Sequence, residues 1–262
     1  MQTPDDTISH QSIPDELIRI AREARAVAVI TGAGISNESG IPTFRGTGSA
    51  HNENWRGVSS KDLATPEAFA RDPRLVWEWY DWRRGLCAAA APNAAHQIVT
   101  AMDRHYPEFL LITQNVDNLH RRAGTTRLVE LHGNIFRARC TRTGRSFPMP
   151  DEIPLREVPL RSPFVPDALA RPDIVWFGET YDERNLNQCL DFLSKADLIV
   201  VVGTSGMVPM PVYLTRHGVS AGAVAVDVNP EVSALTEVSQ YYLEGKAGQV
   251  LPEFWRRVVA GD

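Results

Sequence analysis

Two short groups of small and polar residues could bind a nucleotide-like ligand. Gly32 and Gly34 follow a short apolar run, and a glycine turn after a buried strand offers backbone N–H groups to a pyrophosphate. Gln114, Asn115 and Asp117 follow a second apolar run. An amide and a carboxylate can bind a carboxamide, and a glutamine can bond ribose hydroxyls. Taken singly, the groups are also compatible with a tight structural turn and with a turn that caps a helix.

A histidine and a tyrosine–arginine pair could take part in chemistry near such a ligand. His132 follows a third apolar run and precedes a glycine, and a histidine with a pKa near neutrality can accept a proton at physiological pH. Tyr80 and Arg83 are three residues apart in a helical stretch and therefore share a helix face. A guanidinium can pair with a carboxylate, and the tyrosine hydroxyl can add a hydrogen bond. The alternative is a surface arginine paired with Asp81 or Glu78.

These groups must be positioned by strands whose carboxyl ends lie together. Near-continuous apolar runs separated by helical stretches are typical of a parallel sheet covered on both faces. In open α/β sheets, ligands bind at the carboxyl ends of the strands. The sequence therefore predicts an α/β, Rossmann-like fold with strands at 27–31, 109–113, 128–131, 198–202 and 223–229.

Two insertions interrupt this pattern and predict a smaller lobe. Residues 46–65 are typical of a loop, 66–91 of a helical stretch rich in aromatic residues, and 138–172 of a proline-rich insert. We expect a single domain over residues 1–262. Its large lobe would comprise 14–45, 94–137 and 173–262, and its small lobe 46–93 and 138–172.

The composition argues against several classes of function. The formal net charge of −5 provides no basic field for nucleic acid. No apolar run approaches the roughly 18–20 residues that cross a bilayer, and the polar first residues do not indicate a targeting peptide. Cys87, Cys140 and Cys189 are far apart and odd in number, which fits a reducing compartment. We expect a cytoplasmic monomer that binds neither nucleic acid nor a membrane.

The segments 31–45, 113–120 and 131–133 together resemble the sirtuins, which cleave NAD and transfer acyl groups from lysine to ADP-ribose. The resemblance implies an NAD-dependent protein-lysine deacylase that consumes NAD, acts on an acylated lysine, and releases nicotinamide and O-acyl-ADP-ribose. Asn115 would act at the leaving nicotinamide, and His132 would remove a proton from the ribose diol. The implied cofactor-binding residues are Gly32, Ala33, Gly34, Ser36, Thr43, Phe44, Arg45, Gln114, Asn115, Asp117, Gly203, Thr204, Ser205, Asn229, Pro230, Glu231 and Ala247.

The same resemblance assigns the remaining site residues. Phe44 would cover the reacting carbon, Arg45 would supply charge, and Thr43 stands where the family often has aspartate. The segment 174–179 resembles the family's substrate strand, to which an extended acyl-lysine peptide adds. The implied substrate residues are Tyr80, Arg83, Val175, Phe177, Gly178 and Glu179. Val175 and Phe177 could instead pack the core.

The spacing of Tyr80 and Arg83 resembles the class III sirtuins, which prefer succinyl, malonyl or glutaryl lysine. The chain departs from the family at the zinc site, which most sirtuins build from two pairs of cysteines. Cys140 stands at the first ligand position, Thr143 stands at the second, and no cysteine occurs between 141 and 188. Because one thiolate cannot form a closed tetrahedral site, we expect no zinc and an insert that is held by packing.

Several alternatives stay open. The chain could be a deacetylase, an ADP-ribosyltransferase or NAD hydrolase on the same fold, or a non-catalytic NAD-sensing module. A hydride-transferring dehydrogenase is disfavoured, because Asn37 stands where the dinucleotide fingerprint has its third glycine.

Overall fold

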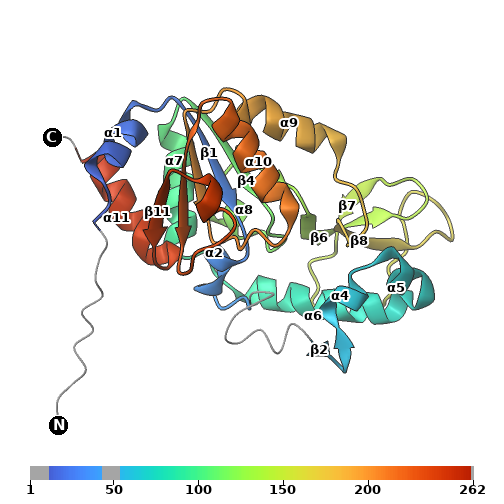
Figure 1. Ribbon diagram of the computed structural model, residues 1–262. Coiled ribbons are helices and arrows are strands. Elements are labelled where there is room, and N and C mark those ends of the chain that lie inside the picture. Colours follow the sequence, from blue (N-terminus) through green and yellow to red (C-terminus); the bar gives the residue numbers. More distant parts are fainter. Residues whose placement is uncertain (1–11, 43–53, 261–262) are drawn as a thin grey trace, which may run out of the picture.

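A computed structural model describes residues 12–42 and 54–260. Its centre is a parallel six-stranded sheet with the order β11-β10-β9-β1-β4-β5 (Figure 1). The strands are β1 (Ala26–Thr31), β4 (Glu108–Thr113), β5 (Leu128–Glu130), β9 (Leu198–Val202), β10 (Val224–Asn229) and β11 (Tyr241–Glu244). The predicted parallel α/β sheet is confirmed, with one strand more than the five expected. The additional strand β11 lies at the sheet edge and is half-buried, so it lacks the continuous apolar run that marks the others.

Helices cover both faces of this sheet. On one face pack α1 (Asp15–Glu23), α7 (Ala94–His105) and α11 (Ala247–Val259), and on the other α9 (Glu183–Leu193) and α10 (Pro209–Ser220) (Figure 1). Successive side chains of a strand point to opposite faces. Thus Val27 and Val29 join the first core, whereas Ala28 and Ile30 join the second. Three short helical segments follow strands or loops: α2 (Gly34–Asn37), α8 (Leu119–Ala123) and η1 (Thr236–Val238).

A second module lies beside the carboxyl ends of the large sheet (Figure 1). Its antiparallel sheet contains β6 (Gly133–Cys140), β7 (Ser146–Pro148) and β8 (Ala170–Ile174), in the order β7-β6-β8. Its helices are α4 (Ser60–Leu63), α5 (Pro66–Arg71) and α6 (Pro73–Ala89). A third core joins them, with Trp77 and Tyr80 of α6 packed in the same cluster as Ile135 and Ala170. Strands β6 and β8 cross the expected lobe borders at 138 and 172, and the division into lobes stays a prediction.

The expected loop over 46–65 is wrong for its described part. Residues 54–63 form a hairpin of β2 (Asn54–Trp55) and β3 (Val58–Ser59), followed by α4. Arg56 and Gly57 both have positive φ angles in the two-residue turn, as hairpin turns of this length require. The helical stretch after it is confirmed but divided at Asp72, whose side chain accepts from Leu75 N at the start of α6.

A buried ion pair fastens the proline-rich insert to α6. Arg84 is 1% exposed and donates to Asp81, to Pro150 O at 2.7 Å and to Glu152 O at 2.5 Å. Asp81 in turn accepts from Leu155 N at 2.8 Å. In the part of the chain that the structure describes, no group of His, Cys, Asp and Glu could hold a metal ion. Among the same residues, no helix is long and apolar enough to cross a membrane.

Candidate active site

The predicted ligand-binding segments meet at one edge of the large sheet, because they follow the carboxyl ends of neighbouring parallel strands. Gly32 N donates to Val202 O at 3.0 Å, and Gly34 N donates to Gly203 O at 2.8 Å. Gln114 N donates to Thr31 O at 3.0 Å. These backbone hydrogen bonds hold the segments after β1, β4 and β9 next to one another.

The glycine turn is built for close approach between two loops. Gly203 has a φ of +60°, and a Cβ there would lie 2.5 Å from Ile35 N and 2.7 Å from Gly34 C. Within the described residues, the backbone N–H groups of Ala33, Thr204 and Ser205 donate no hydrogen bond. Free amides on converging glycine-rich loops fit the phosphates of a dinucleotide.

The Asn115–Asp117 segment forms a compact polar cluster with Ser36. Ser36 Oγ donates to Asp117 Oδ2 at 2.7 Å, and Asn115 Nδ2 donates to Ser36 Oγ at 3.1 Å and to Gly32 O at 3.0 Å. Burial raises the pKa of Asp117, and the bond from Ser36 acts against this rise. The side-chain oxygen of Asn115 accepts no hydrogen bond among the described residues, which leaves an acceptor suited to a carboxamide N–H.

Two threonines that the sequence analysis did not single out support this cluster through hydrogen bonds. Thr31 Oγ1 donates to Thr113 Oγ1 at 2.8 Å, and Thr113 Oγ1 also accepts from Asn115 N at 3.0 Å. His120 Nε2 lies 3.1 Å from Thr31 Oγ1. Burial holds the pKa of His120 well below its ordinary value, with a further lowering from His96. A neutral His120 therefore supports the end of β1 rather than the reacting atoms.

The far side of the site carries the residues expected at the adenosine end. Gln114 Nε2 donates to Thr204 Oγ1 at 2.9 Å, and Asn229 Nδ2 donates to Thr204 O at 2.9 Å. Asn229 also donates to Asp227 Oδ1, and burial raises the pKa of this aspartate. Asp227 was missed, although an acid inside an apolar strand is a usable signal. Further out, Pro230 and Glu231 are exposed, whereas Ala247 is buried at the start of α11.

His132 sits between the two sheets with its tautomer fixed. Its Nδ1 lies 3.0 Å from Gln114 O; because a carbonyl only accepts, Nδ1 carries the proton and Nε2 keeps a lone pair. Burial lowers the pKa of His132, so the ring is neutral at neutral pH. Tyr181 stacks on it, with ring centroids 5.7 Å apart and its hydroxyl 3.4 Å from Nε2. Nothing in the sequence pattern indicated this tyrosine.

The glycine after His132 is required by the approach of β8. Gly133 has a φ of +86°, and a Cβ there would overlap the carbonyl oxygen of Asp173. Beside it, Val175 N donates to His132 O at 2.9 Å. The histidine backbone and the expected substrate segment are therefore hydrogen-bonded directly to each other.

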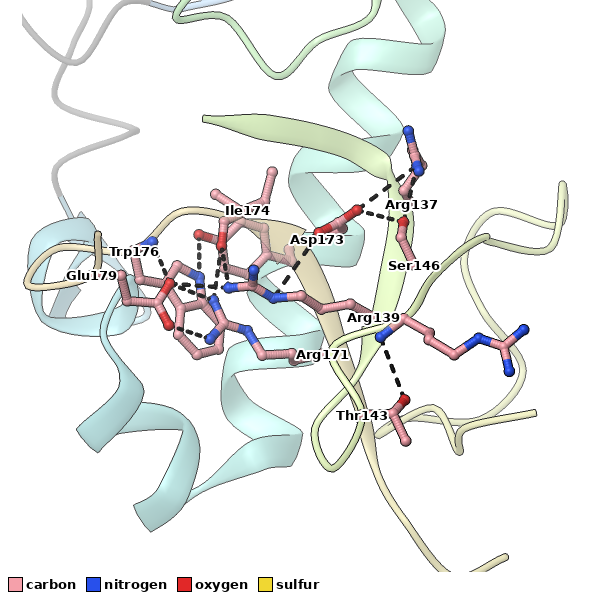
Figure 2. Close-up of polar contacts among 11 residues, drawn as sticks. Arg137, Arg139, Thr143, Ser146, Arg171, Asp173, Ile174, Trp176 and Glu179 are labelled. Atoms are coloured by element: carbon pink, nitrogen blue, oxygen red, sulfur yellow. Dashed lines mark hydrogen bonds and ion pairs between the residues drawn. The ribbon is translucent and has the colours of Figure 1, made fainter. Parts of the chain in front are cut away.

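Beyond Ile174, the segment expected to bind the acyl-lysine peptide (174–179) is not a strand, and its role in binding stays a prediction. Strand β8 ends at Ile174, and Phe177 and Gly178 form a turn in which Phe177 is 51% exposed. Glu179 accepts from Arg171 at both carboxylate oxygens, from Arg139 at 3.2 Å, and from Trp176 N (Figure 2). These hydrogen bonds fix the position of the turn relative to Arg171 and Arg139.

Tyr80 and Arg83 lie on one face of α6, as their spacing predicts. The Arg83 guanidinium is 5.9 Å from the Tyr80 ring and 5.0 Å from that of Trp79. Its positive charge also acts against the burial-driven rise in the pKa of Asp117. Tyr80 is buried, and its oxygen accepts from Trp176 Nε1 at 2.9 Å. Three further expected residues, Thr43, Phe44 and Arg45, lie outside the described residues.

The model of the Sir2 family matches residues 32–210. The chain belongs to the Sir2 family. It is 44% identical over 234 residues to the NAD-dependent protein deacylase of Leptospira interrogans, covering 89% of this chain and 93% of the relative. To the NAD-dependent protein deacylase of Thermococcus kodakarensis it is 42% identical over 249 residues, covering 92% and 93%.

Solved structures agree with this assignment. A Sir2 homolog–NAD complex superposes with a TM-score of 0.85 at 38% identity, covering 94% of each chain. A Sir2 variant with a deacetylated p53 peptide and 3′-O-acetyl ADP-ribose gives 0.75 at 28% identity, covering 93% of this chain and 96% of that one. The expected sirtuin family and Rossmann-like fold are therefore confirmed. The roles of the individual residues in this sirtuin stay predictions.

Proposed function

We propose that this sirtuin removes acidic acyl groups, of the succinyl, malonyl and glutaryl type, from protein lysine. The broader activity is NAD-dependent protein-lysine deacylation, with NAD consumed as co-substrate, in keeping with the family and its relatives. The observation that carries this broader activity is the neutral His132, whose Nδ1 is held by Gln114 O, next in the chain to Asn115, so that Nε2 keeps a lone pair.

Bound NAD supplies an activated bond between nicotinamide and ribose C1′. Around that bond, Asn115 and Asp117 hold the carboxamide, and the free amides after β1 and β9 hold the phosphates. The lone pair on His132 Nε2 would accept a proton from a hydroxyl of the bound ribose. The bond from Nδ1 to Gln114 O keeps the ring in the required tautomer and stabilises the positive charge that forms.

The preference for acidic acyl groups rests on Tyr80 and Arg83. Tyr80 contacts Trp176, which directly follows Val175, so its hydroxyl adjoins the segment expected to hold the acyl-lysine. Arg83 brings a positive charge to the same face of α6. An arginine can pair bidentately with a distal carboxylate, and an acetyl group offers no such partner. Deacetylation by the same His132 would persist at a lower rate.

A second candidate is NAD hydrolysis or ADP-ribosyl transfer without deacylation. The bond from Val175 N to His132 O argues against it, because it joins the base to the expected peptide-binding segment.

The test compares matched succinyl-lysine and acetyl-lysine peptides with NAD, following nicotinamide release and peptide mass. We expect faster removal of succinyl, and loss of both activities in His132→Ala. Arg83→Leu should lower the succinyl-to-acetyl ratio of kcat/KM by about 10- to 100-fold, as expected for hydrogen bonds to a charged group. Nicotinamide release with both peptides intact would instead indicate a hydrolase. Equal rates on the two peptides would refute the acidic-acyl preference.

A further inference from the structure

The indole of Trp176 is held in place from several sides. The Arg171 guanidinium lies 3.2 Å from the ring centroid, and Glu179 accepts from Trp176 N at 2.8 Å (Figure 2). The ring of Phe69 lies 5.5 Å away. Glu179 is itself paired with Arg171 at 2.5 Å. Only 3% of Trp176 is exposed.

This fixed indole determines that the Tyr80 hydroxyl oxygen acts as the acceptor in their hydrogen bond. The distance from Trp176 Nε1 to Tyr80 Oη is 2.9 Å. An indole N–H can only donate, so the tyrosine oxygen is the acceptor and its own proton must point elsewhere. Among the described residues, the Tyr80 hydroxyl donates to no other group. Burial raises the pKa of Tyr80 to about 12, so the proton is present at neutral pH.

We infer that Trp176 is a specificity-determining positioning residue: by donating to Tyr80, it directs the tyrosine proton toward the carboxylate of an acidic acyl group. A carboxylate only accepts hydrogen bonds, so a tyrosine whose proton is free serves it, whereas a tyrosine that donates to the protein does not. An acetyl methyl group gains nothing from the same proton. The inference rests on the proposed acidic-acyl activity and deepens it.

The experiment is a double-mutant cycle on the succinyl-to-acetyl ratio of kcat/KM, using Trp176→Phe, Tyr80→Phe and the double variant of the full chain. Trp176→Phe keeps an aromatic ring but removes the N–H. We expect it to lower the ratio by about 3- to 10-fold, the effect of one hydrogen bond. In the Tyr80→Phe background it should change the ratio less than 2-fold, because the hydroxyl it orients is gone.

Trp77→Phe is the matched control. Trp77 is a buried tryptophan of α6 whose indole N–H donates to Ala170 O at 2.9 Å and not to Tyr80. It should lower stability in the same way but leave the ratio unchanged. Should Trp176→Phe not fold, benzothienylalanine at position 176 replaces the N–H by sulfur in a ring of nearly the same size, and the same ratio is measured.

The outcomes separate the two proposals. A wild-type enzyme without succinyl preference overturns both the proposed function and this inference. A preference that Tyr80→Phe lowers but Trp176→Phe does not would overturn the role of Trp176 alone. Equal losses of the ratio in Trp176→Phe and Trp77→Phe would also overturn it, because they would indicate a general effect of lost packing in the small module.

Discussion

Replacing Arg84 with alanine tests how the proline-rich insert is held against α6. Arg84 is 1% exposed and its partner Asp81 is 7% exposed, so the substitution leaves a buried carboxylate without its cation. The insert also loses two bonds from α6, those to Pro150 O and Glu152 O. If the ion pair fastens the insert, its loss should destabilise the whole fold and loosen residues 150–155.

The magnitude follows from burial. Breaking a buried ion pair by removing one partner costs about 3–5 kcal/mol, mostly because of the uncompensated charge. The two carbonyls add little, since residues 150–152 are exposed and water can replace the guanidinium. Alanine is a slightly better helix former than arginine, which returns a few tenths of a kcal/mol, about 0.2. We therefore expect a loss of about 3–5 kcal/mol in the free energy of unfolding.

The assay is urea unfolding of the full chain, with Arg74→Ala as the control. Arg74 lies on the same helix and pairs with Glu78, but it is 74% exposed, and an exposed pair of this kind contributes only about 0.3–0.5 kcal/mol. Combining Arg84→Met with Asp81→Leu should recover part of the loss, because no buried charge is left unpaired. A cost for Arg84→Ala as small as that of Arg74→Ala would refute the reasoning.

Two further predictions concern acid stability and the glycine after the base. Burial lowers the pKa of His96 to about 4 and that of His120 well below 6.5. Below pH 6.5, these histidines therefore bind protons in the unfolded chain but not in the folded state. The free energy of unfolding should be highest above pH 6.5 and fall by about 1.4 kcal/mol per pH unit for each histidine toward pH 4. Equal urea midpoints at pH 7 and pH 5 would contradict this. Gly133→Ala should cost more than about 3 kcal/mol, because strain at positive φ adds to the overlap with the Asp173 carbonyl. Gly222 has a φ of +111° and open space around it, so Gly222→Ala measures the backbone strain alone in the same urea unfolding experiment. Equal losses of unfolding free energy in the two variants would rule out a contribution from the overlap.

The large sheet was predictable because its strands are buried on both faces. A parallel strand that is buried on both faces is mostly apolar. Strands β1 and β9 are buried throughout, and β4 and β10 are buried except at their first residue. The edge strand β11 was missed because its residues, Tyr241–Glu244, contain no run of aliphatic side chains. The hairpin over 54–59 was missed because its signal is a two-residue turn, Arg56-Gly57, in a polar stretch that is typical of a loop.

The site was predictable where a residue's chemistry depends on its own segment. Gln114, Asn115 and Asp117 follow a strand end, and they meet Gly32 because neighbouring parallel strands end at the same edge. Arg84 could not be assigned in this way. Its partners at 150 and 152 lie far along the chain, and a sequence gives no register between a helix and a proline-rich insert.

His132 is the residue where the two sheets become one functional unit. Its side chain is bonded to Gln114 O after β4, and its backbone carbonyl accepts from Val175 N after β8. His132 is therefore linked to both sheets: a shift of the antiparallel sheet would move the histidine backbone, while the large sheet would still hold its ring. The second module therefore contributes to the position of His132. An insert loosened by loss of the Arg84 ion pair would slow deacylation through the position of His132, even though Arg84 contacts neither NAD-binding segment.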